Sequence, residues 1–278
     1  MGVHSGKFGM VNGQSAVRNW SVNLTSAPKK YVASHTAQGP GRKRGIQDWT
    51  GSFGCYGGKP IIMPGDTFTF AGFTAPTTGV EATNGDVYSG SAIVDSVALT
   101  WNYETGDIIS HVVNFGGNGA WAKTASHYED ATDPDLNECI DISAKVDGET
   151  LDNVTQITLT ITAENKTYVN SSTAGWTKRL AGTIDATLAV GLHDTNPDGF
   201  VTGLGDDNEF KLFVNADDFW LLRWFKFKDI NGLNVNREGG DVIAFTANFE
   251  MSGLDADNAV GCIVLPGETT AWWGEDPV

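Results

Sequence analysis

Cysteine, long apolar runs and helical periodicity are all scarce in this chain of 278 residues. The three cysteines (Cys55, Cys139 and Cys262) are odd in number and far apart, which predicts free thiols rather than a disulfide framework. No apolar run approaches the roughly 18 residues of a membrane span. Residues 1–10 lack an apolar core and a cleavage pattern, so we expect a protein made and folded in a cytosol, with no membrane partner.

Sequence motifs for catalysis are also missing. The five histidines are scattered without the spacing of a zinc site, and there is no serine-hydrolase elbow, phosphate-binding loop, dinucleotide fingerprint or Cys-x-x-Cys pair. We therefore expect no enzymatic activity and no cofactor.

One short segment resembles a metal site. Asp194, Asn196 and Asp198 precede Gly199 and fit the start of a calcium loop, which places acidic oxygens on alternate residues. The closing glutamate is missing, because Gly205 stands at that position. The same residues also make an ordinary Asx/Pro turn, and we favour the turn.

Lysine and arginine are few, and the net charge is −16. Residues 1–140 hold nine Lys and Arg against twelve Asp and Glu, a net −3, and residues 141–278 hold nine against twenty-two, a net −13. Such acidity argues against binding nucleic acid through its phosphates. It is compatible with repelling a polyanion, with binding cations or with solubility alone.

Two groups of side chains allow a binding role as well as a structural one. The nine tryptophans could stack on sugars, or could fill cores and subunit contacts. The basic cluster Arg42–Arg44, echoed by Lys178 and Arg179, could grip phosphate or contact a neighbouring subunit. We favour the structural reading of the tryptophans and the subunit contact for the basic cluster.

Glycine, threonine, valine, phenylalanine and asparagine are frequent, which favours strands and turns over helices. We expect an all-β, mainly antiparallel fold with at most one or two short helices. Alternating polarity or β-branched runs predict strands at 20–24, 46–56, 67–73, 157–162, 183–192, 209–214 and 244–249. Residues 219–228 read as strand, or as a short helix plus strand. Ser26–Gly45 contains two prolines and several glycines, so we expect a long excursion there rather than a continuous strand.

The chain contains an internal repeat. Shifted by 134 positions, Asp95–Gly119 lies on Asp229–Gly253 with ten identities in 25 positions and no gap, and each copy reads as a β-hairpin around a Gly-Asp turn. Shifted by 137 positions, Lys29–Ala37 lies on Lys166–Ala174. We therefore predict two tandem duplicated β-sandwich or barrel domains, 1–140 and 141–278, with their junction within 130–145.

The order of these blocks resembles a known family. Val-Asn-Gly is followed by an alternating strand, a long Gly- and Lys-containing excursion, Trp-Thr-Gly-Ser-Phe, a strand introduced by Pro-Gly-Asp, and a hairpin. This order resembles the tail tube proteins of tailed bacteriophages, whose fold is shared with secretion-tube proteins of the Hcp type. Most such proteins carry one domain and form hexamers. A few carry two, and similar trimers make a pseudo-hexameric ring.

The resemblance implies roles for particular residues. The excursions Ser26–Gly45 and Ala163–Gly182 would reach the adjacent ring, and their candidate contact residues are Lys29, Lys30, Tyr31, Arg42, Lys43, Arg44, Lys166, Tyr168, Lys178 and Arg179. The hairpins Asp95–Phe115 and Asp229–Phe249 would line the channel, with Glu104, Asp107, Glu238 and Asp241 as lumen candidates. An acidic lumen would let DNA slide through without sticking.

By the same resemblance, the protein would be a structural part of the virion tail, assembled in the cytoplasm of a bacterial host. Its partners would be other copies of itself, the terminator, tape-measure and distal-tail proteins, and DNA passing without specific binding. Two alternatives stay open. One is a tandem β-sandwich module for carbohydrate binding or host attachment. The other is a different tail protein, such as a terminator or distal-tail protein.

Overall fold

The computed structural model describes residues 10–11, 16–32, 40–74, 86–125, 143–193, 204, 207–234, 243–252 and 262–273. These residues are almost entirely antiparallel β-structure, with one short 3-10 helix, η4 (Ser171–Thr173). The all-β prediction is confirmed. The second hairpin turn, residues 235–242, and the calcium candidates Asp194, Asn196 and Asp198 lie outside the described residues.

The described residues of the first half form six strands. They are β1 (Met10–Val11), β2 (Val17–Tyr31), β3 (Gly41–Tyr56), β4 (Thr67–Phe73), β5 (Asp86–Asn102) and β6 (Ser110–Ala125). The second half contains the others. They are β7 (Ala144–Val146), β8 (Glu149–Thr150), β9 (Val154–Ala163), β10 (Lys166–Tyr168), β11 (Lys178–Leu180), β12 (Ile184–His193), β13 (Asn208–Phe213), β14 (Phe219–Asn234), β15 (Ala244–Met251) and β16 (Cys262–Val264).

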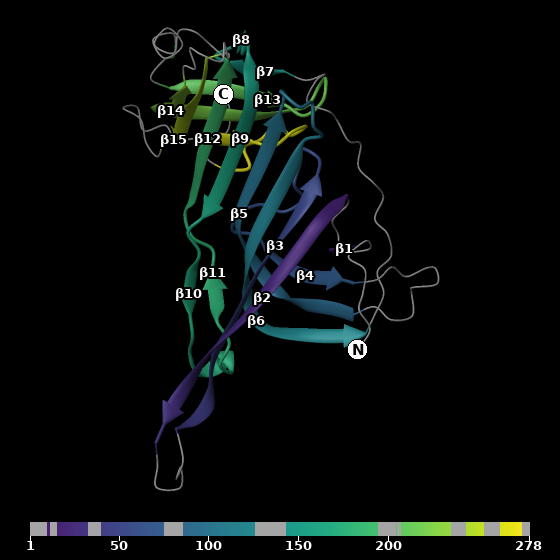
Figure 1. Ribbon diagram of the computed structural model, residues 1–278, viewed down its shortest axis with the longest axis vertical. Helices are drawn as coiled ribbons and strands as arrows, with labels where there is room; N and C mark the ends of the chain where they lie inside the picture. Colours follow the sequence, from purple (N-terminus) through teal and green to yellow (C-terminus); the bar gives the residue numbers. More distant parts are fainter. Residues whose placement is uncertain are drawn as a thin grey trace.

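One large sheet runs through both halves in the order β2-β3-β6-β5-β9-β12-β15-β14-β13-β7-β8. Strand β5 of the first half pairs directly with β9 of the second half, and the two lie side by side near the middle of the molecule (Figure 1). Strand β4 pairs with β5 off this path, and β16 pairs with β14. The sheet is therefore continuous across the middle of the chain.

The two halves pair their strands in the same register. Trp20 faces Phe53 across β2 and β3, and the residues 137 positions further along, Ile157 and Val190, face each other across β9 and β12. The same shift relates the outer ends of the two hairpins, where Lys30 faces Arg42 and Thr167 faces Arg179. We call two residues that hold the same place in this pattern counterparts.

The register agreement includes an irregularity. Strands β2 and β3 change register between Val17 and Asn19, and β9 and β12 change it between Gly191 and Leu192, where Leu192 faces Val154. Strands β3 and β6 pair as β12 and β15 do, so Phe115 and Phe249 are counterparts.

The gap-free alignment of Asp95–Gly119 with Asp229–Gly253 is wrong by one residue along the first strand of the hairpin. Ser96 faces Asn114 and Asp229 faces Asn248, so Ser96 and Asp229 are counterparts at a shift of 133 instead of 134. The shift of 134 returns at Asn234, after an irregularity that begins at Asn231. Gly232 lies there with a φ of 70°, a conformation that glycine adopts without strain, so the strand accommodates the extra residue.

The expected excursion at Ser26–Gly45 is mostly strand, which corrects the sequence prediction. Strand β2 continues to Tyr31 and β3 begins at Gly41, leaving only residues 33–39 outside the described part of the hairpin. Pro28 sits where the register shifts between Ala27 and Lys29, so the ladder does not need its missing N–H. Residues 219–228 also form strand throughout, without the short helix considered above.

A single buried cluster contains side chains of both halves. Two indoles link the halves directly, because Trp101 donates from Nε1 to the Phe213 carbonyl at 3.0 Å and Trp220 donates to the Gly58 carbonyl at 2.7 Å. Residues 126–142, which contain most of the expected junction, lie outside the described residues. The division into domains 1–140 and 141–278 stays a prediction.

Candidate functional site: the inner joint and the two open edges

The junction of β5 and β9 joins the two halves of the sheet. Leu99 faces Leu159 and Val97 faces Ile161, and all four side chains are fully buried. The residues that alternate with them along β9 lie on the opposite, partly exposed face, and these are Thr158, Thr160 and Thr162. We call the pairing of residues 96–102 with 156–162 the inner joint.

Strand β14 carries the counterpart of the β5 side of this joint. Its residues 219–225 pair with β13, as the early part of β5 pairs with β4. Further along β5, strand β9 takes the place of β4 as the pairing partner on that side. No described strand pairs with the same side of Asp229–Asn234 on β14. An unpaired row of strand N–H and C=O groups invites another strand. We call this segment the β14 edge.

Strand β2 carries the counterpart of the β9 side. It pairs with β3 along one side, and it stands at the end of the strand order of the large sheet. Leu24 on β2 is 53% exposed, while its counterpart Ile161 is completely buried at the inner joint. Likewise Leu233 on the β14 edge, which aligns with Leu99 in the sequence repeat and lies within the irregular stretch, is 54% exposed, while Leu99 is completely buried. Each open edge therefore exposes a large apolar side chain at a position that the inner joint covers.

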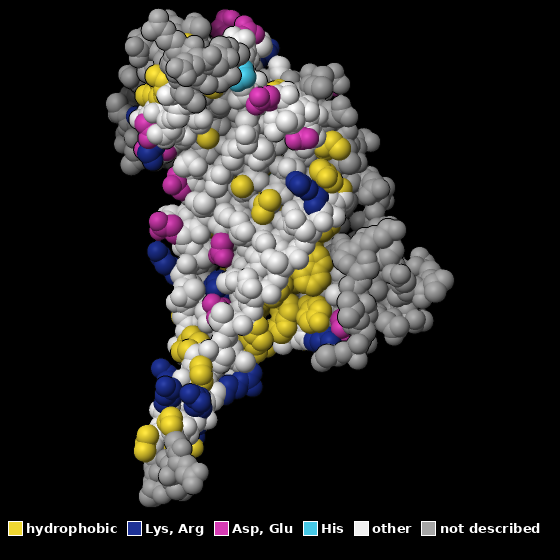
Figure 2. All heavy atoms as spheres, viewed as in Figure 1, with side chains coloured by type: hydrophobic (Ala, Val, Ile, Leu, Met, Phe, Trp, Pro, Cys, Tyr) yellow, Lys and Arg dark blue, Asp and Glu magenta, His cyan; other side chains and the backbone are white. Residues whose placement is uncertain are grey.

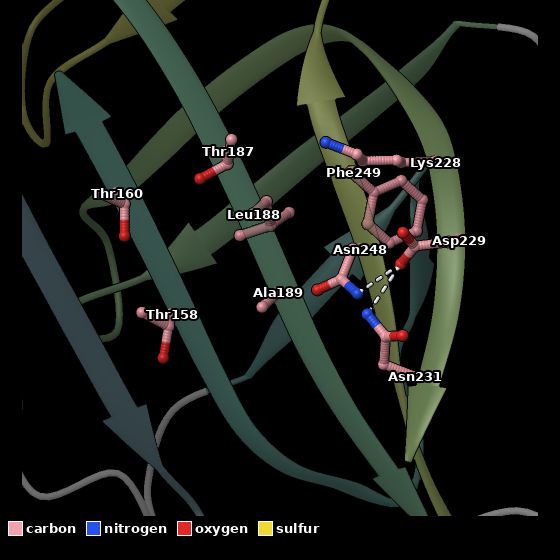
Figure 3. Close-up of a pocket in the computed structure, with 10 residues that line it drawn as sticks. All are labelled: Thr158, Thr160, Thr187, Leu188, Ala189, Lys228, Asp229, Asn231, Asn248 and Phe249. Carbon is pink, nitrogen blue, oxygen red and sulfur yellow. Dashed lines mark hydrogen bonds between the residues drawn. The ribbon is translucent and has the colours of Figure 1, made fainter. Parts of the chain in front are cut away.

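Small polar side chains dominate the exposed face of the sheet near the β14 edge. Figure 3 shows Thr158 and Thr160 on β9 beside Thr187 on β12, all on one face. Asp229 accepts hydrogen bonds from Asn248 at 2.6 Å and from Asn231 at 3.0 Å (Figure 3). The first half places Ser21, Ser52 and Asn114 on the same face, and Ser21 and Ser52 are bonded at 3.0 Å.

The second-half residues of this face line a hollow of about 280 Å³, together with Leu188, Ala189, Lys228 and Phe249. Its walls come from four neighbouring strands, and apart from Lys228 and Asp229 its lining side chains are uncharged. Lys228 pairs with Glu250 at 2.9 Å, and this hydrogen bond raises the pKa of Lys228. The hollow brings together amides and hydroxyls, but it contains no nucleophile paired with a base and no set of metal-ligating side chains.

Two arms extend from the sheet in the same direction (Figure 1). The first is the outer part of the β2–β3 hairpin, and the second consists of β10, η4 and β11. The first arm is basic, and Figure 2 shows lysine and arginine gathered on it. Its exposed cations are Lys29, Lys30, Arg42, Lys43 and Arg44.

The second arm packs against the first half of the chain. The Thr177 N–H donates a hydrogen bond to the Gln47 carbonyl at 2.9 Å, and the Gln47 N–H donates one to the Gly175 carbonyl at 2.8 Å. Arg179 extends from β11 to Asp48 and makes two hydrogen bonds to its carboxylate, at 2.9 and 3.0 Å. The Arg179 side chain is only 7% exposed, so this ion pair is built into the structure.

No protein-family model matches the chain, and no curated protein matches it significantly.

The structure separates the expected ring-contact residues into two groups. Tyr31 and Tyr168 are counterparts and are 38% and 40% exposed, and Lys166 is exposed on the same second arm. Lys178 and Arg179 instead contact the first half of their own chain, where Lys178 donates from Nζ to the Asn118 carbonyl at 2.9 Å. The first group and the basic residues of the first arm remain accessible for contacts with another molecule.

The two expected lumen residues that the structure describes lie at the end of the first hairpin rather than on the face of the sheet. Glu104 and Asp107 are exposed in the turn between β5 and β6, where Thr105 donates to Asp107 at 2.6 Å. Glu238 and Asp241 lie outside the described residues. Sequence reasoning missed the Ser/Thr/Asn face, although the alternation of threonine with aliphatic residues in 157–162 indicates it.

The remaining candidates for chemistry have structural surroundings. His111 is buried and bonds through Nδ1 to the Gly57 carbonyl at 2.8 Å; burial lowers its pKa, against a smaller opposing effect of that bond. Burial raises the pKa of the Cys55 thiol to about 12. Within the described ranges no three His, Cys, Asp or Glu side chains gather as metal ligands. No described helix is long and apolar enough to cross a membrane.

Proposed function

We propose that this protein is a structural subunit that joins other copies of itself edge to edge into closed rings, which stack into the tube of a phage tail. The observation that carries this proposal is the correspondence between the open edges and the inner joint. The β14 edge is the counterpart of one side of that joint and β2 is the counterpart of the other side. The chain therefore presents both halves of an interface that it already forms once within itself.

The inner joint provides a register for the joint between copies. Its pair Val97–Ile161 becomes Ile230–Leu24 when each residue is replaced by its counterpart. Its pair Leu99–Leu159 becomes Leu233–Val22 when Leu233 is taken as the residue that aligns with Leu99 in the sequence repeat. Apolar residues then meet apolar residues in both pairs. Covering a leucine side chain contributes about 1.5–3 kcal/mol, and each new backbone hydrogen bond about 0.5–1.5 kcal/mol.

A ring built this way removes the exposed strand edges, as closed sheets do. Repetition of one head-to-tail contact closes into a ring when the rotation per copy allows it. By the resemblance to tail tube proteins, three copies with two halves each would supply six positions. The two arms point the same way out of the sheet (Figure 1), and those of their side chains that stay exposed, such as Lys166 and Tyr168, would contact the next ring.

The polar face of the sheet suits the wall of a DNA channel. Its threonine, serine and asparagine side chains offer no cationic grip on phosphate, and the net charge of −16 repels a polyanion. A duplex would then pass without sticking. In this proposal the channel wall is formed by the strands, and the hairpin turns with Glu104 and Asp107 lie at its end.

Negative-stain electron microscopy of the purified full-length chain tests this function. Wild-type protein should form rings or tubes, and the double variant Leu24→Lys, Leu233→Lys should remain monomeric, because each lysine places a charge where the joint buries an apolar side chain. Circular dichroism should be unchanged, since both side chains are more than half exposed in the single chain.

The matched control is Ile61→Lys, which changes a 64% exposed isoleucine away from both edges and should leave assembly intact. A wild-type chain that stays strictly monomeric at high concentration would contradict the proposal. Rings that never stack would favour a terminator or distal-tail protein instead.

The carbohydrate-binding alternative receives less support from the tryptophans. Trp49, Trp101 and Trp220 are fully buried, and their rings cannot stack on a sugar. The indole nitrogens of all three donate to backbone carbonyls, which fixes them as core residues. Binding to a glycan array by the monomer would revive this alternative.

A further inference from the structure

The ion pair between Arg179 and Asp48 has an unused counterpart elsewhere in the same chain. Arg179 lies opposite Thr167 across the second arm, and Arg42 lies opposite Lys30 at the same place in the first arm. Asp48 lies opposite Thr25 on β2, and Asp185 lies opposite Thr162 at the same place on β9. The repeat therefore supplies a second arginine and a second aspartate in the positions that form the buried pair.

The two aspartates are oriented by the same local bond. Asp48 accepts a hydrogen bond from the Trp49 N–H through Oδ1 at 2.9 Å, and Asp185 accepts one from the Ala186 N–H through Oδ1 at 2.8 Å. This bond turns each carboxylate toward the following residue. The Asp185 carboxylate on β12 is thus held by the same local bond as the Asp48 carboxylate on β3, which binds Arg179.

Neither Arg42 nor Asp185 forms an ion pair among the described residues, and both side chains are exposed. Arg42 differs from Arg179 in the part of the molecule that its arm can reach. The second arm extends from β9, which joins β5 of the same chain, and so it reaches the first half. The first arm extends from β2, whose open edge has no described partner in its own chain.

The surface around Asp185 is complementary in charge to the first arm. At the inner site the Arg179 guanidinium passes over Gly116, where an added Cβ would lie 2.1 Å from its Nε. The counterpart of Gly116 is Glu250, because Gly116 faces Thr50 and Glu250 faces Thr187. The side chain of Glu250 therefore occupies the space that Gly116 leaves open for Arg179, and Glu250 already pairs with Lys228 at 2.9 Å. An arginine bound by Asp185 must approach along a different path, in the half of the chain with a net charge of −13.

We infer that the first arm docks on the second half of another copy of this chain, with Arg42 paired with Asp185 of that copy at the position that corresponds to the pair of Arg179 with Asp48. This contact rests on the proposed edge-to-edge assembly and adds a specific ion pair to it. Desolvated charge pairs of this kind fix the register of an interface and exclude wrong partners.

Charge reversal in the full-length chain tests the contact. Arg42→Glu and Asp185→Arg should each weaken self-association by roughly ten- to a hundredfold in sedimentation experiments, because each leaves like charges facing across the interface. The double variant Arg42→Glu, Asp185→Arg should regain most of the lost association. Circular dichroism of every variant should match the wild type, since both positions are exposed in the single chain.

Lys43→Glu is the matched control, because it makes the same change of charge on the neighbouring residue. The counterpart of Lys43 is Leu180, which is 58% exposed and uncharged, so the repeat offers no ion pair at this position. This variant should weaken association less than Arg42→Glu. Equal effects of the two variants, or no recovery in the double variant, would overturn the pairing.

The outcomes separate this contact from the function on which it rests. If wild type assembles and Leu24→Lys, Leu233→Lys does not, the edge joint holds whatever the charge variants do. In that case unchanged association in the charge variants overturns only the arm contact. A monomeric wild-type chain overturns both.

Discussion

The two halves of the chain share a strand register but pack different side chains beneath it. Trp49 in the first half has Ala186 as its counterpart, and Phe53 has Val190. Compensation is visible nearby. Gly117 leaves room for the Trp49 ring, which an added Cβ would approach to 2.2 Å, whereas the counterpart of Gly117 is the larger Met251 and the counterpart of Trp49 is the smaller Ala186. A large residue in one half thus corresponds to a small one in the other, and cores tolerate such exchanges best when the total volume is kept.

The pairing at the backbone is less tolerant of change than the core. Both halves keep the register irregularity at the inner end of the first hairpin, and both keep a glycine at the base of the arm, Gly45 and Gly182. A register slip of one residue moves every side chain of a strand to the wrong face. The comparison indicates that this fold is specified by its register and bends, and that several packings satisfy them.

The halves also differ at the joints. At the inner joint Asn165 donates to the Val94 carbonyl at 2.9 Å and to Asp95 at 2.8 Å. The counterpart of Asn165 is Pro28, whose side chain has no donor. The joint proposed between copies therefore lacks this contact, and its specificity rests on the apolar edge pairs and on the charges of the first arm.

The largest expected effect comes from removing the residue that most distinguishes the two cores. Trp49→Ala should lower the free energy of unfolding by about 3–5 kcal/mol, because it leaves a cavity and an unpaired Gly119 carbonyl. Urea denaturation followed by circular dichroism measures this. Trp176→Ala, on the partly exposed second arm, is the control and should cost clearly less. Equal losses would mean that the two halves do not depend differently on their aromatic residues.

The next effect should be the same in both halves. Gly45→Ala and Gly182→Ala should each destabilise the protein by about 1–3 kcal/mol, because the added Cβ would lie 1.5 Å from the Ala27 carbonyl oxygen and 1.8 Å from that of Glu164. Denaturant unfolding of both variants provides the comparison. Thr183→Ile, which copies the exposed Ile46 of the first half, should change stability by no more than about 0.5 kcal/mol. A neutral Gly45→Ala beside a costly Gly182→Ala would break the equivalence.

The smallest effect is a difference in pH dependence. His111 has Phe245 as its counterpart, and both are buried. Burial lowers the pKa of His111 below its ordinary value of 6.5, so the unfolded chain binds a proton before the folded chain does. Stability should therefore fall as the pH drops below 6.5, with a slope from this residue of at most about 1.4 kcal/mol per pH unit.

His111→Phe should remove that part of the pH dependence. The variant loses the bond to the Gly57 carbonyl and can be less stable at neutral pH, so the informative quantity is the slope between pH 7 and pH 5, measured by urea denaturation in buffers on the order of 0.1 M salt. An unchanged slope would show that His111 is protonated alike in both states.

Much of the strand layout could be predicted from local patterns. Alternating side chains indicate β4 with its observed bounds and the central part of β9, and the repeated blocks indicate which hairpins correspond. The first arm was harder, because prolines and glycines usually interrupt strands; here Pro28 and Gly45 face each other at one bulge, where a strand tolerates both. The lumen candidates Glu104 and Asp107 lie in a turn, while the face itself carries hydroxyls and amides.

The sequence by itself determined the all-β class, the correspondence of the two halves and the surplus of negative charge, because these depend on local periodicity, self-similarity and composition. Only the tertiary structure decided that β5 pairs with β9, that Arg179 is buried against Asp48 while Arg42 is exposed, and that Leu24 and Leu233 stand at open edges. Strand order and burial depend on contacts between residues far apart in the chain, and no local pattern encodes which of two equivalent edges has a neighbour.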